Sequence, residues 1–164
     1  MNEATMLSAL ASQAFWESHG NSATTEDIRS YINEAYNVEV LRNELSDEAN
    51  LYYCIFVNSV PAGYSKIVLN SQYPDSQAKN ISRLDRLYLL REFYDQNLGS
   101  ELFEFNLNLV RQNNQSGIWL YAWTENERAL GFYRKHGFKI IGSHNFRISE
   151  THSNPNHQML LSFW

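Results

Sequence analysis

The spacing of apolar residues predicts that the first part of the chain is helical. Apolar side chains recur at steps of three and four in residues 3–19 and again after Thr24, as on the buried face of an amphipathic helix. Gly20 is a typical helix stop, and Thr24 with Asp27 three positions later approximates a capping box that opens the second helix. Residues 38–45 predict a further helical turn or two.

After residue 50 the pattern changes to short apolar runs, which predict strands separated by turns and by two more helices. The predicted strands are 51–57, 63–69, 84–90, 118–123, 138–141 with a continuation towards 148, and 157–163. The predicted helices are 98–113 and 126–136, and the predicted turns or loops are 58–61, 70–80, 91–97, 114–117 and 150–156. This order predicts an α/β fold, a mixed sheet with helices on both faces, in a single domain spanning 1–164.

Composition and charge narrow the classes of partner. Apolar residues make up 43% of the 164 residues and charged residues 19%, as in globular proteins. The net charge of −5 argues against a nucleic-acid partner, because neutralising phosphates requires an excess of Lys and Arg. The same charge permits an acidic cleft for a cationic small molecule. The high aromatic content, 14%, is better explained by a packed core than by base stacking.

The sequence also bears on where the protein is located and on whether it binds a metal. No N-terminal segment resembles a signal peptide, and no apolar run approaches the roughly 20 residues of a membrane span, so we expect a soluble, cytoplasmic protein without a membrane partner. The only cysteine, Cys54, lies in an apolar run that favours an inert thiol. The histidine spacing suits no tight metal site, so we expect no metal.

The stretch 84–105 takes the chain from a predicted strand into a helix N-terminus, with Gly99 just inside the helix. Such a junction can place free backbone N–H groups around an anion. One glycine is not a glycine-rich loop, so an ordinary strand-to-helix connection is the better explanation of this stretch when it is taken alone.

A second block makes the chain recognisable. Its pattern resembles the B motif of the GCN5-related N-acetyltransferase (GNAT) superfamily, and the residues that carry it are Asn126, Ala129, Phe132, Tyr133, Lys135, Gly137 and Phe138. By element order the resemblance covers roughly residues 51–164. Phe15-Trp16-Glu17, Thr25-Glu26-Asp27, Tyr31 and Gly63-Tyr64-Ser65-Lys66 look like the branch of the family that acetylates polyamines.

The resemblance implies a GNAT-type fold, a mixed, mostly antiparallel central sheet flanked by about four helices. In the family a strand normally precedes the first helix, and here only Met1 and Asn2 stand before it. Either that first strand is absent or the chain begins late.

The resemblance also implies acetyl-CoA as the acetyl donor. Its pantetheine arm would pair with the backbone of the strand at residues 87–89, and its pyrophosphate would meet the N–H groups of residues 96–100. Asn97 replaces the first glycine usual in the family's phosphate loop, and Asn tolerates the positive φ of such a turn. Asn126 is either a helix N-cap or a pantetheine ligand, or both. The implied cofactor-binding residues are Leu87, Tyr88, Leu89, Asp95, Gln96, Asn97, Leu98, Gly99, Ser100, Asn126, Tyr133 and Lys135.

Two residues are candidates for catalysis. Tyr133 matches the family tyrosine that protonates the leaving thiolate, although its helical spacing also suits plain core packing. We expect Asp85, Leu87 and Leu89, at every second position, to lie on one face of their strand. Asp85 is a candidate base for the acceptor amine, or else a partner of Arg83 or Arg86 in an ion pair. The acidic residues of the leading helices, Glu17, Asp27 and Glu34, either line an acceptor cleft or belong to solvated faces.

The resulting hypothesis is an N-acetyltransferase that moves an acetyl group from acetyl-CoA to a primary amine by direct attack, without an acyl-enzyme. The acceptor partner is a small-molecule amine, with a polyamine such as spermidine as first choice. Acetylation of a peptide N-terminus or lysine, and a catalytically weak acyl-CoA sensor module, are the alternatives. Family analogy adds a homodimer through the C-terminal strands.

Overall fold

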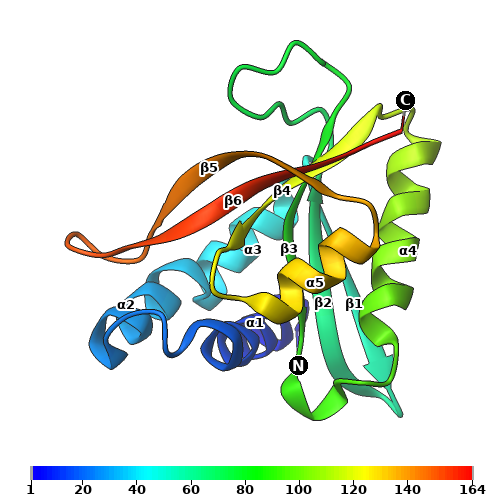
Figure 1. Cartoon of the computed structure of the whole chain (residues 1–164). Helices are drawn as coiled ribbons and strands as arrows, with labels where there is room; N and C mark the ends of the chain where they lie inside the picture. The colour runs from blue at the N-terminus through cyan, green and yellow to red at the C-terminus, as the bar shows by residue number, and fades with distance from the viewer. Residues whose placement is uncertain (1, 164) are drawn as a thin grey trace.

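The computed structural model describes residues 2–163, in which five α-helices and one 3₁₀ turn surround a six-stranded sheet (Figure 1). The helices are α1 (Glu3–His19), α2 (Thr25–Ala35), α3 (Val38–Ser46), α4 (Leu98–Gln112) and α5 (Glu127–Lys135), with the 3₁₀ turn η1 at Arg91–Phe93. The strands are β1 (Asn50–Val57), β2 (Val60–Val68), β3 (Ser82–Leu89), β4 (Gly117–Trp123), β5 (Lys139–Arg147) and β6 (Ser153–Ser162).

The sheet opens between its two middle strands. The strand order is β1-β2-β3-β4-β6-β5, and every neighbouring pair is antiparallel except β3 and β4. These two parallel strands pair only at Ser82 with Ile118 and at Arg83 with Trp119, and then diverge (Figure 1). From Asp85 onward, β3 therefore turns one edge of its backbone towards the opening rather than towards β4.

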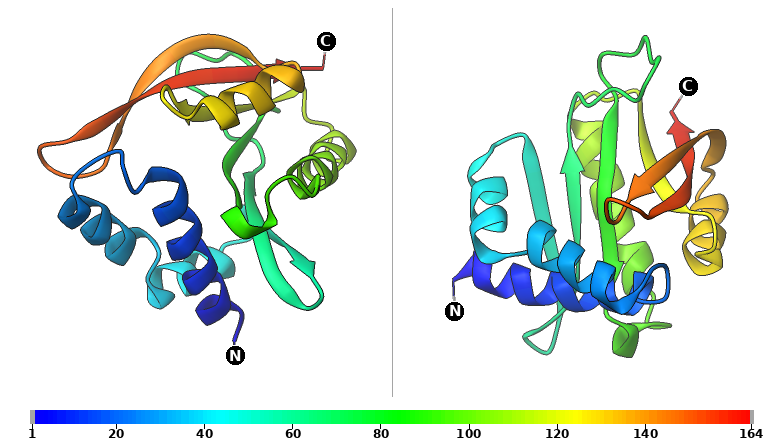
Figure 2. Two further views of the ribbon diagram at one scale, coloured as in Figure 1. Left: turned by 60° about the horizontal axis from the view of Figure 1, so that its bottom comes forward. Right: turned by 90° about the vertical axis from the view of Figure 1, so that its left-hand side faces the viewer.

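The two faces of the sheet carry separate cores, with α1–α3 on one side and α4 and α5 on the other (Figure 2). Phe103 of α4 and Leu130 of α5 pack with Ile67 and Ile118 of the strands on one face. The opposite core holds the α1–α3 residues Leu7, Phe15, Ile28 and Leu41, together with Tyr64 of β2. The expected mixed sheet with helices on both faces is confirmed.

A β-bulge at Asp85 changes which way this residue faces. Lys66 of β2 pairs with Arg86 and Ile67 pairs with Leu84, so Asp85 is an extra residue on β3. As a result Leu84 and Leu87, three positions apart, both pack on the α4 side. The prediction that Asp85 shares a strand face with Leu87 and Leu89 is therefore wrong. The Asp85 carboxylate instead meets Lys66 on the side of α1–α3.

Three other predictions need correction. The helical turn expected at 38–45 is a separate helix, α3, which brings the helices to five in the described residues. β6 begins at Ser153 inside the polar stretch predicted as a turn, because its backbone pairs with β4 and β5 whatever its side chains are. The turn between β1 and β2 needs only Asn58 and Ser59, both at positive φ (48° and 67°), as in a two-residue hairpin turn.

Between residues 2 and 163 no strand precedes α1, and none of the helices is both long and apolar enough to cross a membrane. Cys54 is half-buried on β1, and burial raises the pKa of its thiol. The raised pKa of the Cys54 thiol agrees with the inert thiol expected from the sequence.

Candidate active site

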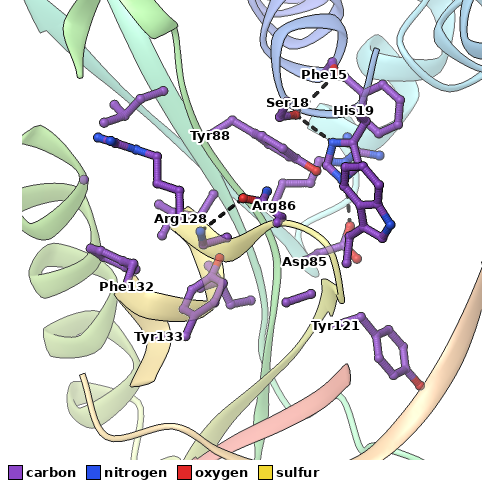
Figure 3. Close-up of a pocket in the computed structure, with 18 of the residues that line it drawn as sticks. Phe15, Ser18, His19, Asp85, Arg86, Tyr88, Tyr121, Arg128, Phe132 and Tyr133 are labelled. Carbon is purple, nitrogen blue, oxygen red and sulfur yellow. Dashed lines mark hydrogen bonds and ion pairs between the residues drawn. The ribbon is translucent and has the colours of Figure 1, made fainter. Parts of the chain in front are cut away.

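A cleft of about 640 Å³ occupies the opening between β3 and β4 (Figure 3). Its walls come from the end of α1, from β3 and β4, from the start of α4, and from α5. Asp85 lines it, and so do all the predicted cofactor-binding residues except Gln96. One place in the fold thus brings together residues that are far apart in the sequence.

The start of α4 forms one end of this cleft. Asn97, the residue before the helix, is left-handed with φ 61° and ψ 7°, and its side chain makes no capping hydrogen bond. The turn therefore takes the conformation for which a glycine is usual, as predicted for an asparagine. The first N–H groups of the helix have no intrahelical acceptor, which suits an anion.

Gly99 lines this end of the cleft. A Cβ built on Gly99 would lie 3.5 Å from Leu89 Cδ1 and 3.8 Å from Phe132 Cε2, which are ordinary contacts. Packing within the protein therefore does not require a glycine here. A residue without a Cβ at this place in the cleft wall would allow the close approach of a phosphate group.

Asn126 caps α5. Its side-chain oxygen accepts a hydrogen bond from the N–H of Ala129 at 3.1 Å. The N-cap role is therefore confirmed. Because Asn126 also lines the cleft, its role as a pantetheine ligand stays a prediction.

Tyr133 joins the core and the cleft. Its ring packs edge-on against Phe132 and Phe138, with 5.5 Å and 5.4 Å between ring centroids, so the core-packing role is confirmed. Its hydroxyl end faces the cleft (Figure 3). Burial raises the pKa of Tyr133, so at neutral pH the phenol keeps its proton. The Tyr133 hydroxyl can therefore act as a proton donor.

Asp85 belongs to a buried network of charges. Its carboxylate lies 2.9 Å from Arg83 Nη2, 3.3 Å from Lys66 Nζ and 3.8 Å from Arg86 Nε, so the ion-pair alternative is confirmed. Glu44 of α3 binds the same Lys66 and Arg86 at 3.2 Å and 3.1 Å. Burial alone would raise the pKa of Asp85, but the three cations outweigh it and lower that pKa. Asp85 is therefore ionised at neutral pH.

The acidic residues of the leading helices lie outside the cleft. The Glu17 carboxylate accepts the backbone N–H of Arg91 at 2.6 Å and so holds the turn after β3. Asp27 accepts a hydrogen bond from its own cap, Thr24. Glu34 accepts one from Ser30. The solvated-face alternative describes these residues better.

Sequence reasoning missed His19, the last residue of α1. Its ring stacks on Phe15, with 4.6 Å between centroids, and its Nδ1 lies 2.7 Å from Ser18 Oγ. Burial lowers the pKa of His19 to about 4, so the imidazole in the cleft wall is neutral. No linear pattern marks this residue, since Trp123, its partner across the cleft, is distant in sequence.

The model of the acetyltransferase (GNAT) family matches residues 7–138 of the chain. The chain belongs to the GNAT family. An uncharacterised N-acetyltransferase of Lactobacillus delbrueckii subsp. lactis is 27% identical over 142 residues, which are 87% of this chain and 82% of that protein. The family that the B motif suggested is therefore confirmed.

Solved structures of other N-acetyltransferases share the fold. The PaiA N-acetyltransferase of Thermoplasma acidophilum, in complex with coenzyme A, has a TM-score of 0.79 at 22% identity and covers 98% of this chain and 93% of its own. A GCN5-related N-acetyltransferase of Rhodopseudomonas palustris has a TM-score of 0.75 at 17% identity, with 98% and 90% covered.

This GNAT protein is an N-acetyltransferase, an enzyme class whose co-substrate is acetyl-CoA. Among residues 2–163, no group of three or more His, Cys, Asp or Glu side chains is placed to hold a metal ion.

Proposed function

We propose that this enzyme acetylates a small primary amine in the β3–β4 cleft, with Tyr133 as general acid. The observation that carries the proposal is the place of Tyr133, a protonated phenol that faces the opening beside the unpaired edge of β3. An acid at this point serves a reaction that expels a poor leaving group, which aminolysis of a thioester does.

The protein would hold acetyl-CoA by groups that it does not use for its own fold. The backbone at Leu87 and Leu89 lies beyond the last β3–β4 pair and is available for pantetheine amides. The N–H groups at the start of α4 suit the pyrophosphate, and Asn126 and Lys135 also line the cleft. Bound acetyl-CoA supplies an activated acetyl group.

Two protons must move during the transfer. Tyr133 would give its proton to the departing thiolate sulfur, and the phenolate would recover a proton through cleft water from the nitrogen, which loses its second proton once it has bonded to the acetyl carbon. A free alkylamine has a pKa of about 10, so its ammonium form must first lose a proton. We propose that cleft water carries this proton away, since Asp85 is already paired with Arg83, Lys66 and Arg86. Its lowered pKa makes Asp85 itself a weak base.

The charges of the cleft bear on the identity of the amine. A polyamine is the acceptor suggested by the resemblance and by the net charge of −5. The cleft wall itself holds more cationic than anionic side chains, namely Arg83, Arg86, Arg128 and Lys135 against Asp85 and Asp95. A linear polycation would be repelled by this balance. We therefore propose that a monoamine with an apolar body is a better acceptor than spermidine.

The test is a panel of acceptors offered to the purified protein with acetyl-CoA. The panel contains spermidine, phenethylamine, and a short peptide with a free N-terminus and a lysine. Release of CoA thiol is followed by absorbance, and the acetylated product is identified by mass spectrometry. Amine-dependent release of CoA supports the enzyme, and the order of turnover identifies the acceptor class. Binding of acetyl-CoA without acetylation of any acceptor would contradict the proposal and favour the sensor module.

A further inference from the structure

The charged side chains around Asp85 form one connected network whose charges do not balance. Its cations are Lys66, Arg83 and Arg86, and its anions are Glu44 and Asp85. Three cations against two carboxylates leave the network with one net positive charge. All five side chains are at least two-thirds buried, and a charge without a counter-charge is costly to remove from water.

Arg83 is the member of this network that presents the excess charge to the cleft. Its side chain is 33% exposed, more than any of the other four, and it belongs to the cleft wall. It lies on β3 in the last residue pair with β4, at the closed end of the opening. A ligand in the cleft can therefore reach the guanidinium of Arg83 without entering the core.

The guanidinium of Arg83 is held in place, but its donors are not all used. Its central carbon lies 5.1 Å from the centroid of the Trp119 ring and 5.4 Å from that of the Tyr121 ring. The Tyr121 ring stacks in turn on His144, with 4.1 Å between the centroids. Within the described part of the chain, Arg83 has one ion-pair partner, Asp85, and its buried Nε–H has no acceptor. A fixed guanidinium with unused donors is suited to a carboxylate.

The cleft wall on the side of α1–α3 is aromatic. Phe15, Tyr31, Tyr88 and Phe146 line the cleft and belong to the core on that side of the sheet. Rings of this kind suit the apolar body of an acceptor. Arg83 adds a single cationic group at one end of this wall.

We propose that Arg83 selects an acceptor amine that also carries a carboxylate. The substrate class is then a monoamine with an aromatic or apolar body and one acid group. Its carboxylate binds the unused donors of Arg83 and supplies the anion that the network lacks, while its amine faces the acetyl donor in the opening. Arg83 determines specificity and takes no part in the proton transfers. This inference deepens the proposed function and rests on it.

The test compares acceptors that differ in one acid group. Phenethylamine is the reference, phenylalanine adds a carboxylate beside the amine, and the para-carboxylate of phenethylamine adds one at the far end of the ring. The para-carboxamide is the uncharged counterpart of the latter. In the natural chain we expect kcat/KM for at least one of the two acids to exceed that for phenethylamine about 10-fold, mainly through a lower KM. The carboxamide should show no such gain.

Substitution of Arg83 should remove this preference and little else. Arg83→Gln leaves two cations and two carboxylates in the network, so the protein should remain folded. We expect kcat/KM for the preferred acid to fall about 10- to 100-fold, and that for phenethylamine to change less than about 2-fold. Arg83→Lys keeps the charge but not the planar fork, so it should keep part of the preference. Arg111→Gln is the control, because Arg111 also stacks on a ring, that of Phe163, outside the cleft wall.

Binding gives a readout that does not depend on turnover. Hydrocinnamate is phenylalanine without its amino group, so it cannot be acetylated on nitrogen. Calorimetric titration should show that it binds the natural chain and Arg111→Gln equally well, and that its dissociation constant rises about 10-fold in Arg83→Gln.

Several outcomes would overturn the role of Arg83. They are the absence of any acid preference in the natural chain, a preference that survives Arg83→Gln, an equal loss for phenethylamine and the acids, or an equal loss in Arg111→Gln. If Arg83→Gln does not fold, an undiminished preference in Arg83→Lys would overturn it. Any of these results together with acetylation of phenethylamine leaves the proposed function standing. If the natural chain acetylates none of the amines, the proposed function fails and this inference fails with it.

Discussion

The imidazole ring of His19 stacks on the indole ring of Trp123, with 5.6 Å between the ring centroids and 30° between the ring planes. This contact joins the end of α1 to the end of β4, the strand that diverges from β3. It therefore closes one side of the cleft with a neutral pair of rings. Protonation of His19 would place a charge in this apolar contact.

The pH dependence of stability follows from His19. The histidine titrates near 6.5 in the unfolded chain and near 4 in the folded protein, so the unfolded chain binds more protons between these values. The stabilisation from neutral His19 is complete above pH 6.5 and falls, by up to about 1.4 kcal/mol per pH unit, as the pH drops towards 4. His19→Phe should lose less stability over this range. Urea unfolding at several pH values measures it, and parallel curves for the two proteins would contradict the buried, neutral state of His19.

The left-handed turn at Asn97 predicts a graded series of variants. Asn97→Gly should keep the stability of the protein and its affinity for coenzyme A, because glycine adopts positive φ freely. Asn97→Ala should cost about 1 to 2 kcal/mol and weaken binding. Asn114, also at positive φ (55°) but outside the cleft, is the matched control. Asn114→Ala should cost similar stability without a change in affinity, and equal losses of affinity in both alanine variants would contradict a local role for Asn97.

Gly63 and Gly131 should respond in opposite ways to alanine. A Cβ on Gly63 would lie 2.4 Å from the backbone oxygen of Tyr88 and 2.4 Å from Leu89 Cδ2, so Gly63→Ala should displace the part of β3 that borders the cleft. A Cβ on Gly131, in the middle of α5, meets nothing within 4 Å. Gly131→Ala should therefore stabilise the protein by roughly 0.5 to 1 kcal/mol. Thermal unfolding measures both, and a neutral Gly63→Ala would show that the close approach is not needed.

Much of the fold was predictable because its signals are local. The periods of apolar residues located the helices and strands, and the block from Asn126 to Phe138 identified the family. The left-handed turn at Asn97 was also predictable, because the residue type tolerates it. These features depend on a few consecutive residues and not on the rest of the structure.

The features that were mispredicted or missed depend on contacts between distant elements. The bulge at Asp85 arises from the pairing of β2 with β3, and no pattern within β3 reveals it. The charge network that holds Asp85 needs Glu44 from α3 and Lys66 from β2. The stacking of His19 similarly requires Trp123 from the other side of the cleft.

The central claim is that the enzyme transfers an acetyl group with Tyr133 as acid, and Tyr133→Phe tests it most directly. Phenylalanine keeps the ring contact with Phe138 and removes only the hydroxyl. We expect kcat for acetylation of the best acceptor of the panel to fall about 10- to 1,000-fold, with the affinity for coenzyme A and the melting temperature little changed. Tyr53→Phe, on β1 outside the cleft, is the control for the loss of a phenol. Unchanged turnover in Tyr133→Phe would contradict the proposed acid and, with it, the mechanism.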